Sequence, residues 1–274
     1  MILGDNNLGI EDVVDIARNG IQIVLSDIVR ANLGKTRDLI EAEWMNDDAP
    51  LIYSFNTGVG AFKNTRVALK DIKEFQTKII YAHATGVGEA LPLDVTRAVM
   101  LLRLNAFCSD HSGVSLAVVD RLIEFLNKGL TPIIPAKGSV GASGDLAPLA
   151  HMAGAMCGFP EAEIVYKGGR MSARSALEQA GCSNELALQS KDASALINGS
   201  TVSLALAVLA LADAENIAEH ADIGLALSLE AMRCEKDAFH PALHAARPHK
   251  GQGQVARNVL ALIGDSQRMT PEAR

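Results

Sequence analysis

Apolar residues recur along most of the chain at intervals of three to five, which is the spacing of one face of an α-helix. The first such stripe contains Val13, Ile16 and Val24 and follows the acidic residues Glu11 and Asp12, which suit a helix N-terminus. The pattern predicts helices over these segments: 11–31, 66–82, the residues that follow Pro92, 114–127, 145–156 and most of 192–265.

Several segments interrupt this helical spacing. Residues 50–65 are rich in Asn, Thr and Gly, which predicts a loop, and residues 129–144 hold two prolines and four glycines, which predicts a connector. The apolar run 164–166 predicts a short strand or hairpin. Breaks in the C-terminal helices are expected near Pro241 and Pro248.

The chain shows no repeat period and no series of alternating strands. We therefore expect a mainly α fold, an Ala/Leu-rich bundle of long helices with a loop-rich N-terminal region. The helix over 114–127 is expected to end at Gly129. No internal boundary is visible, so residues 1–274 are predicted to form a single region.

Amino-acid composition limits the kinds of molecule that the chain is expected to bind and the compartment in which it is expected to occur. The 274 residues are 49% hydrophobic and only 4% aromatic, which favours closely packed helices. The net charge of −7 excludes the basic surface that nucleic acid or an anionic membrane needs, so neither is an expected partner. Four separated cysteines form no CxxC pair, and the acidic N-terminus lacks a signal-peptide pattern. These features predict a cytoplasmic protein with reduced thiols.

One segment is long enough to test for membrane insertion. Residues 193–212 carry no charge, which is compatible with a bilayer span. The first half of this segment holds several polar groups, among them Ser194, Asn198 and Thr201, which would be costly in lipid. We therefore expect a buried helix and no membrane.

The connector ends in Gly138-Ser-Val-Gly141-Ala-Ser-Gly144-Asp145-Leu. It lacks the lysine of a P-loop, the Gly-x-Ser-x-Gly of a nucleophile elbow and a GxGxxG pattern. A triad of Ser143, Asp145 and His151 fails as well, because residues six apart do not share a helix face. Composition alone favours a flexible connector that leads into a helix capped near Asp145.

A second interpretation of the connector is chemical. In a tight turn, the amide nitrogen of Gly144 can attack the carbonyl carbon of Ala142, and loss of water closes a five-membered ring. Loss of a second water from Ser143 leaves an exocyclic methylene. The product, 4-methylidene-imidazol-5-one, is an electrophile that no ordinary side chain supplies. Glycine is needed at 144 because a side chain would crowd the attack.

The segment 138–151 resembles the signature of the histidine and phenylalanine ammonia-lyase family. Further blocks agree with this family in order and spacing, and the resemblance extends over essentially the whole chain. They are Tyr53-Ser-Phe-Asn-Thr-Gly-Val-Gly60, His83-Ala-Thr-Gly-Val-Gly-Glu89, Leu102-Arg-Leu-Asn105, Ser112-Gly-Val114, Leu196-Ile-Asn-Gly-Ser200 and Arg247-Pro-His249 with Gly251 and Gln252. The resemblance is greatest to histidine ammonia-lyases.

The resemblance implies a role for each matching residue. Ala142, Ser143 and Gly144 would form the ring, the only cofactor expected. Tyr53 would remove the β-proton of an amino acid substrate, and Asn198 would hydrogen-bond the ring. The substrate amine would add to the methylene, and elimination would release ammonia and a conjugated acrylate. His83 and Gly60 would bind the substrate.

The substrate is less firmly indicated than the reaction. From spacing alone, His83 is either a core residue that continues the stripe of Ile72 and Ile79 or a ligand. The pair Ala82 and His83 is closer to the Ser-His of histidine lyases than to the pattern of phenylalanine and tyrosine lyases. We therefore expect L-histidine to be converted to trans-urocanate. An aromatic amino acid lyase or a 2,3-aminomutase is the alternative.

The chain also departs from the family pattern. Ser54 replaces a glycine, Val59 a phenylalanine, Ala82 a serine and Ser200 a threonine, which would reshape the pocket. Family members are about twice as long, and the arginine that binds the substrate carboxylate would follow Arg274. The chain is thus a fragment, one half of a split enzyme or a degenerate homologue. A homotetramer or a complex with a C-terminal half chain is the expected assembly, and a non-catalytic half-subunit is the other functional possibility.

Two further patterns are interpreted as structural. His240, His244 and His249 are not expected to bind a metal, because Pro241 and Pro248 disturb the helix that would hold the rings. The GxGxxA pattern that begins at residue 251 follows no strand, so no nucleotide site is expected.

Overall fold

The computed structural model describes residues 1–4, 7–141 and 144–269. Contacts divide the chain into two compact units, Met1–Leu209 and Ala210–Arg274. No boundary is visible in the sequence at this point, because the helix Thr201–Met232 runs through it without interruption. That the whole chain forms one functional region stays a prediction.

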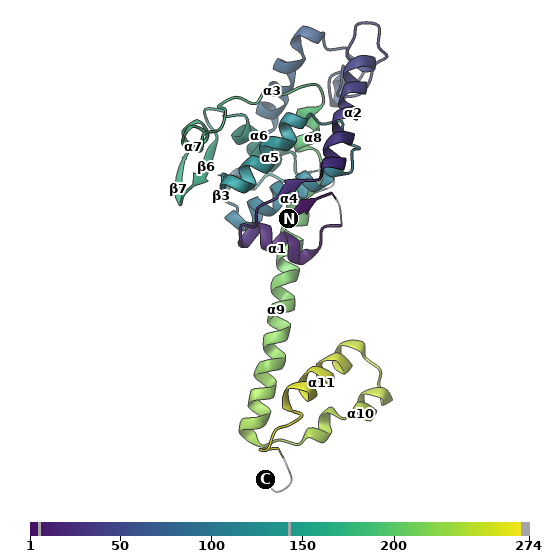
Figure 1. Cartoon of the computed structure of the whole chain (residues 1–274), viewed down its shortest axis with the longest axis vertical. Coiled ribbons are helices and arrows are strands. Elements are labelled where there is room, and N and C mark those ends of the chain that lie inside the picture. The colour runs from purple at the N-terminus through teal and green to yellow at the C-terminus, as the bar shows by residue number, and fades with distance from the viewer. Residues whose placement is uncertain (5–6, 142–143, 270–274) are drawn as a thin grey trace. The chain divides into compact units, whose positions relative to one another are not determined.

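Helices build most of the larger unit, which confirms the mainly α class (Figure 1). Their bounds are α1 Ile10–Arg18, α2 Asp27–Trp44, α3 Ile72–His83, α4 Leu93–Cys108, α5 Leu116–Lys128, α6 Leu146–Met156, α7 Ala173–Gln179, α8 Asp192–Ile197 and the first residues of α9 Thr201–Met232. Short 3-10 turns occupy Gly60–Phe62 and Leu69–Asp71. The loop predicted over 50–65 is confirmed.

Strands are short and lie at the margins of the helices. Strands β1 Ile2–Leu3 and β2 Val24–Leu25 pair in parallel, and β3 Val87–Ala90 pairs with β5 Pro135–Lys137 in antiparallel fashion. A three-stranded sheet joins β4 Thr131–Pro132, β6 Glu163–Tyr166 and β7 Gly169–Ser172. The β6–β7 hairpin confirms the strand predicted at 164–166.

The core of the larger unit lies where α4, α5 and α6 pack together. Phe107 on α4 and Phe125 on α5 are fully buried and are the bulkiest residues of this core. Helix α6 is buried along almost its whole length, because its many alanines let neighbouring helices approach closely. This helix also packs against α3 and α8.

The helix predicted over 11–31 is wrong. It ends at Arg18, because Gly20 has a left-handed backbone with φ +70°. The Asn127 side chain then bonds the backbone N–H and C=O of Ile23, which holds the chain extended beside β1 until α2 begins at Asp27. The apolar stripe across this break belongs to separate elements.

Other helix ends follow the local signals. Helix α5 is followed by Gly129, whose φ of +71° is the expected left-handed C-terminal conformation. Asp145 occupies the cap position of α6, as predicted. The helix predicted over 66–82 begins only at Ile72, after a 3-10 turn.

The smaller unit consists of the remainder of α9, the 3-10 turn Lys236–Phe239, α10 Pro241–Ala246 and α11 Lys250–Ile263. Pro241 begins α10 and Pro248 separates it from α11, which confirms both predicted breaks. The buried apolar cluster of this unit is small and consists of Ala226, Val259, Ile263 and Met269.

By length and composition, the run Asp192–Met232 passes a test for a membrane-spanning helix, and 39% of its most apolar window is buried within the protein. The structure interrupts this run between α8 and α9. Val202, Ala205 and Leu209 at the start of α9 belong to the core of the larger unit.

Candidate active site

The tyrosine predicted as the base lies in a turn between α2 and α3. Its hydroxyl accepts a hydrogen bond from the backbone N–H of Gly60 at 3.3 Å, so the structure brings these two predicted site residues together. The Tyr53 side chain is 49% exposed. Its phenol is thus open to a substrate on the surface of the larger unit.

The turn is held in shape by a buried asparagine. The Asn56 side chain accepts from the N–H of Ile52 at 2.8 Å and donates to the carbonyls of Trp44 and Pro50 at 3.0 and 2.9 Å. All three bonds are made without contact with water, because Asn56 is fully buried. The Asn-Thr-Gly part of the motif is therefore structural, and it presents the tyrosine.

His83 is the last residue of α3. Its ring nitrogen Nδ1 lies 2.7 Å from the carbonyl oxygen of Ile79, one turn earlier in the same helix. If Nδ1 carries the proton, Nε2 keeps its lone pair for another partner. The ring is half-buried, so neither the core interpretation nor the ligand interpretation is excluded by its burial.

The turn predicted to cyclise is closed by its flanking glycines. The Gly144 N–H donates to the carbonyl of Gly141 at 2.6 Å, and the Gly144 carbonyl accepts from Val140 N at 3.0 Å. A Cβ at residue 144 would lie 2.3 Å from the oxygen of Gly141 and 2.4 Å from its nitrogen, so only glycine fits. Ala142 and Ser143 lie outside the described residues.

Asp145 fixes this turn to the start of α9. Its carboxylate is fully buried and accepts the backbone N–H groups of Val202 and Ser203 at 2.7 and 3.1 Å. It also accepts the Ser139 hydroxyl at 2.6 Å. One carboxylate thus caps the N-terminus of α9 and holds the connector before Gly144.

Asn198 directly follows α8, and its backbone is held from two sides. Buried Arg103 on α4 donates to the carbonyl of Asn198 at 2.7 Å, and Asp145 N donates to the carbonyl of Gly199 at 3.1 Å. A Cβ at Gly199 would lie 2.7 Å from Arg103 Nη1, which explains the glycine. Burial lowers the pKa of the Arg103 guanidinium, which also lies over the Phe107 ring.

The three helices that carry these residues pack against one another. Helix α3 ends at His83, α6 begins two residues after Gly144, and α8 ends at Ile197, directly before Asn198. The segment after α3 reaches α6 through the Gly86 N–H, which donates to Nε2 of His151 at 3.0 Å. Burial lowers the pKa of His151, which favours the neutral ring that this bond requires.

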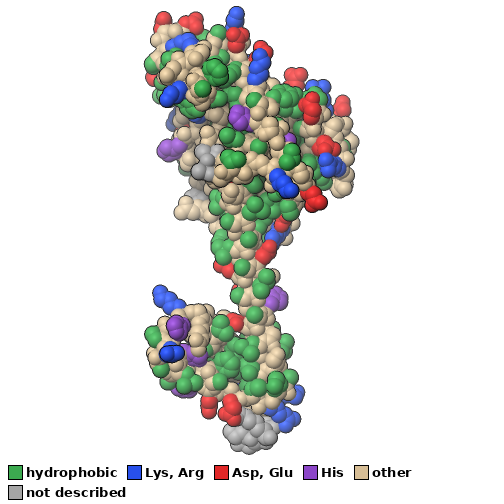
Figure 2. Space-filling model, turned by 180° about the vertical axis from the view of Figure 1, so that it is seen from behind, with side chains coloured by type: hydrophobic (Ala, Val, Ile, Leu, Met, Phe, Trp, Pro, Cys, Tyr) green, Lys and Arg blue, Asp and Glu red, His purple; other side chains and the backbone are tan. Residues whose placement is uncertain are grey.

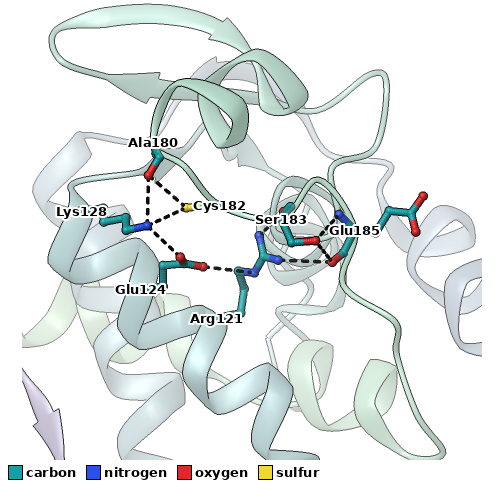
Figure 3. Close-up of polar contacts among 7 residues, drawn as sticks. All are labelled: Arg121, Glu124, Lys128, Ala180, Cys182, Ser183 and Glu185. Atoms are coloured by element: carbon teal, nitrogen blue, oxygen red, sulfur yellow. Dashed lines mark hydrogen bonds and ion pairs between the residues drawn. The ribbon is translucent and has the colours of Figure 1, made fainter.

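The segment before α8 is bound firmly to α5 (Figure 3). Arg121 donates to the carbonyls of Ser183 and Glu185 at 2.8 and 3.3 Å, and Lys128 donates to that of Ala180 at 3.0 Å. The α8 helix then begins at Asp192, so these bonds fix the path of the chain toward Asn198.

Sequence reasoning missed Arg103, Lys191 and the hydrogen bond of His151. Lys191 is half-buried, with Nζ 5.8 Å from the centroid of the Tyr53 ring and 5.1 Å from that of Phe55. Burial lowers the pKa of its ammonium. Arg103 lies in one of the blocks that resemble the family, and the available signal was a single charged residue within the apolar run 99–107.

The smaller unit has a hollow of about 740 Å³ that holds none of the predicted site residues. Its lining includes His244, His249 and Arg257, and Figure 2 shows histidine and basic side chains close together on this unit. Within the described ranges, no three His, Cys, Asp or Glu side chains gather to hold a metal ion.

Comparison with known proteins identifies the class. The sequence model of the aromatic amino acid lyase family matches residues 8–274. The chain therefore belongs to this family, which confirms the resemblance seen in its motifs.

Individual relatives show which members of the family the chain resembles. The chain is 41% identical to a histidine ammonia-lyase of Caldanaerobacter subterraneus, over 98% of this chain and 52% of the relative. Among solved structures, a histidine ammonia-lyase from Trypanosoma cruzi aligns with TM-score 0.87 and 33% identity over 98% of this chain and 52% of its own. A phenylalanine aminomutase of Pantoea agglomerans gives TM-score 0.88 and 32% identity, covering 99% and 51%. The chain thus spans about half the length of the curated relatives it matches.

Proposed function

We propose that the chain is the N-terminal part of an ammonia-lyase that converts L-histidine to trans-urocanate and ammonia. The observation that carries the proposal is the turn at 141–144, where a Cβ at residue 144 would meet the backbone of Gly141 at 2.3 Å. A turn this tight is what cyclisation of Ala142-Ser143-Gly144 requires. The similarity to histidine ammonia-lyases supports the choice of substrate.

The methylidene-imidazolone ring would be held by the chain's own backbone at residues 142–144. When formed, it supplies an electrophile that activates the substrate amine for elimination. Gly144 fits this group, because a Cβ at this position would lie 2.3 Å from the Gly141 oxygen, whereas glycine leaves the backbone free to close the ring. Asp145 would keep the turn closed through its bonds to Ser139 and to the start of α9.

The other residues would act on the substrate. Tyr53 would take the β-proton at its phenol oxygen, which the Gly60 N–H already orients. The Asn198 amide would hydrogen-bond the ring from a backbone held by Arg103. His83 would bind the imidazole of the substrate at Nε2 and use Nδ1 for Ile79.

The proposed assembly is a homotetramer or a complex with a chain that supplies the second half of the family's length. The substrate carboxylate needs a cation, and that group is expected in the second half. We propose a cytoplasmic location, with no metal, nucleotide, nucleic acid or membrane partner. A phenylalanine or tyrosine lyase or an aminomutase remains the second candidate, which the similarity to a phenylalanine aminomutase supports.

The test is the intact mass of the chain purified from its own host. Loss of two waters relative to the sequence is expected, and Ser143→Ala should lose at most one, because the hydroxyl that leaves as the second water is absent. Rates with L-histidine, L-phenylalanine and L-tyrosine would then identify the substrate, and β-amino acid products would indicate an aminomutase. An unmodified mass in the native chain contradicts the proposal and leaves the non-catalytic half-subunit.

A further inference from the structure

Ser54, next to the proposed base, has an unusual backbone. Its φ is +64°, in the left-handed region that residues with a Cβ rarely adopt. The family motif has glycine at this position, for which the conformation carries no steric penalty. Ser54 is also fully buried. A strained and buried residue beside a reactive one persists only where other interactions over-determine it.

The compensating interaction is a hydrogen bond to another element. The Ser54 hydroxyl donates to the Ser194 hydroxyl on α8 at 2.7 Å. The Ser194 hydroxyl in turn donates to the carbonyl of Lys191 at 3.3 Å, and the Ser54 N–H donates to Thr57 Oγ1 at 3.0 Å. Both hydroxyl protons are therefore used, and the chain of bonds runs from the turn into the first turn of α8.

This link is distinct from the bonds that shape the turn. The Asn56 side chain bonds residues of the turn and of the segment before it. Ser54 reaches α8, and the flanking rings of Tyr53 and Phe55 lie against the Lys191 ammonium beside it. Asn198 directly follows the same short helix. The turn and the helix end are thus joined through a few rigid residues.

We propose that Ser54 is a positioning residue that ties the turn carrying Tyr53 to α8 and so fixes the phenol relative to Asn198. Glycine would adopt this backbone conformation without strain but would make no side-chain bond. Serine accepts the strain, and its hydroxyl bonds directly to Ser194 on α8. This inference rests on the proposed roles of Tyr53 and Asn198, and a misplacement of about 1 Å at a reacting group costs on the order of 100-fold in rate.

Two substitutions at residue 54 separate the bond from the strain. Ser54→Ala removes the bond and keeps the strained backbone, whereas Ser54→Gly removes both. Ser194→Ala removes the acceptor and leaves residue 54 unchanged, which keeps the test open if Ser54→Ala fails to fold. The matched control is Ser175→Ala, which breaks another serine pair, with 2.9 Å between hydroxyls, on the exposed surface of α7.

The chain's single tryptophan reports on the turn. Trp44 packs edge-on against Phe55, with ring centroids 5.0 Å apart, and its carbonyl accepts from Asn56. Acrylamide quenching of its fluorescence should rise in Ser54→Ala, Ser54→Gly and Ser194→Ala and stay unchanged in Ser175→Ala. In the assembled enzyme, we expect kcat to fall about 10- to 100-fold in the first three variants, with KM changed by less than about twofold.

The quenching results test the link between Ser54 and Ser194 whether or not the chain catalyses the proposed reaction. Unchanged quenching in Ser54→Gly and Ser194→Ala would overturn the tie, whether or not the ring forms. Increased quenching with unchanged kcat would also overturn the positioning role and leave a purely structural bond. A Ser54→Ala/Ser194→Ala double variant no worse than either single one supports the proposal, whereas strictly additive effects contradict it. An unmodified mass in every variant refutes the proposed function, and the quenching result still stands.

Discussion

The two units have similar Ala/Leu-rich helices but bury them to different extents. In the larger unit, α4, α5 and α6 surround fully buried side chains such as Phe107 and Phe125. In the smaller unit, four residues make up the buried cluster, and Ile217 and Leu227 on α9 are 68% and 67% exposed. Composition alone therefore does not decide burial; the number of elements available to cover each helix does.

The difference in burial indicates that the larger unit can be tested in the isolated chain, whereas the smaller unit needs a partner surface to cover its apolar residues. The residues of the proposed site have their supporting contacts within the larger unit. The apolar residues of α9 in the smaller unit are the kind of surface that other protein covers. We expect that surface to be buried in the assembled enzyme.

The largest expected effect is at Gly144. Gly144→Ala should abolish ring formation entirely, because the added Cβ would lie 2.3 Å from the Gly141 oxygen. The intact mass of the variant should equal that of the unmodified chain. A variant that still loses two waters would show that the turn described here is not the one that cyclises.

A matched pair of truncations tests the contrast in burial. Phe107→Ala should lower the free energy of unfolding by about 3–5 kcal/mol, because it removes a fully buried ring. Ile217→Ala should change it by less than about 0.5 kcal/mol in the chain alone, because the side chain is exposed. Denaturant unfolding of both variants provides the measurement, and equal losses would contradict the comparison.

The pH dependence of stability should report on His151. Its pKa is lowered by burial, so the unfolded chain binds the proton more readily than the folded chain. The free energy of unfolding should therefore fall as the pH drops below about 6.5, and the loss ends below the folded pKa. His151→Gln should flatten this part of the profile. An unaltered profile in His151→Gln would contradict this assignment.

A small stabilisation is expected in the interior of α9. Gly224 has open space around its Cβ position, so Gly224→Ala should stabilise the chain by about 0.5–1 kcal/mol through higher helix propensity. A rise in the thermal midpoint of the isolated chain checks this. If the same variant weakens the assembled protein, Gly224 lies at a close helix contact in the assembly.

Signals confined to a few residues predicted the fold well. The glycine after α5 is recognisable from neighbouring residues and is confirmed. Asp145 lies at the predicted N-cap position of α6, but its side chain bonds the start of α9 instead of capping α6. The helix over 11–31 failed, because Asn127 holds Ile23 from a distant part of the chain. Hydrophobic spacing carries no information on such a contact.

The site shows the same limit. Motifs indicated Tyr53 and Gly60, which the structure joins by a hydrogen bond. They did not indicate that Arg103 holds the carbonyl of Asn198, a residue 95 positions later. They also gave no indication of the Ser54–Ser194 bond, which spans 140 positions. Such partners are set by the packing of segments far apart in the sequence, which local patterns do not encode.

The cap on α9 has a consequence for synthesis on the ribosome. The Asp145 carboxylate that secures the turn at 141–144 depends on the N–H groups of Val202 and Ser203. These residues emerge from the ribosome long after the turn itself, so we expect ring maturation to wait until they have been translated. Nascent chains released before and after Ser203, compared by mass for the loss of two waters, would locate this step. Ring formation would then depend on synthesis of the first turn of α9. This order would delay the reactive electrophile until the larger unit can enclose it.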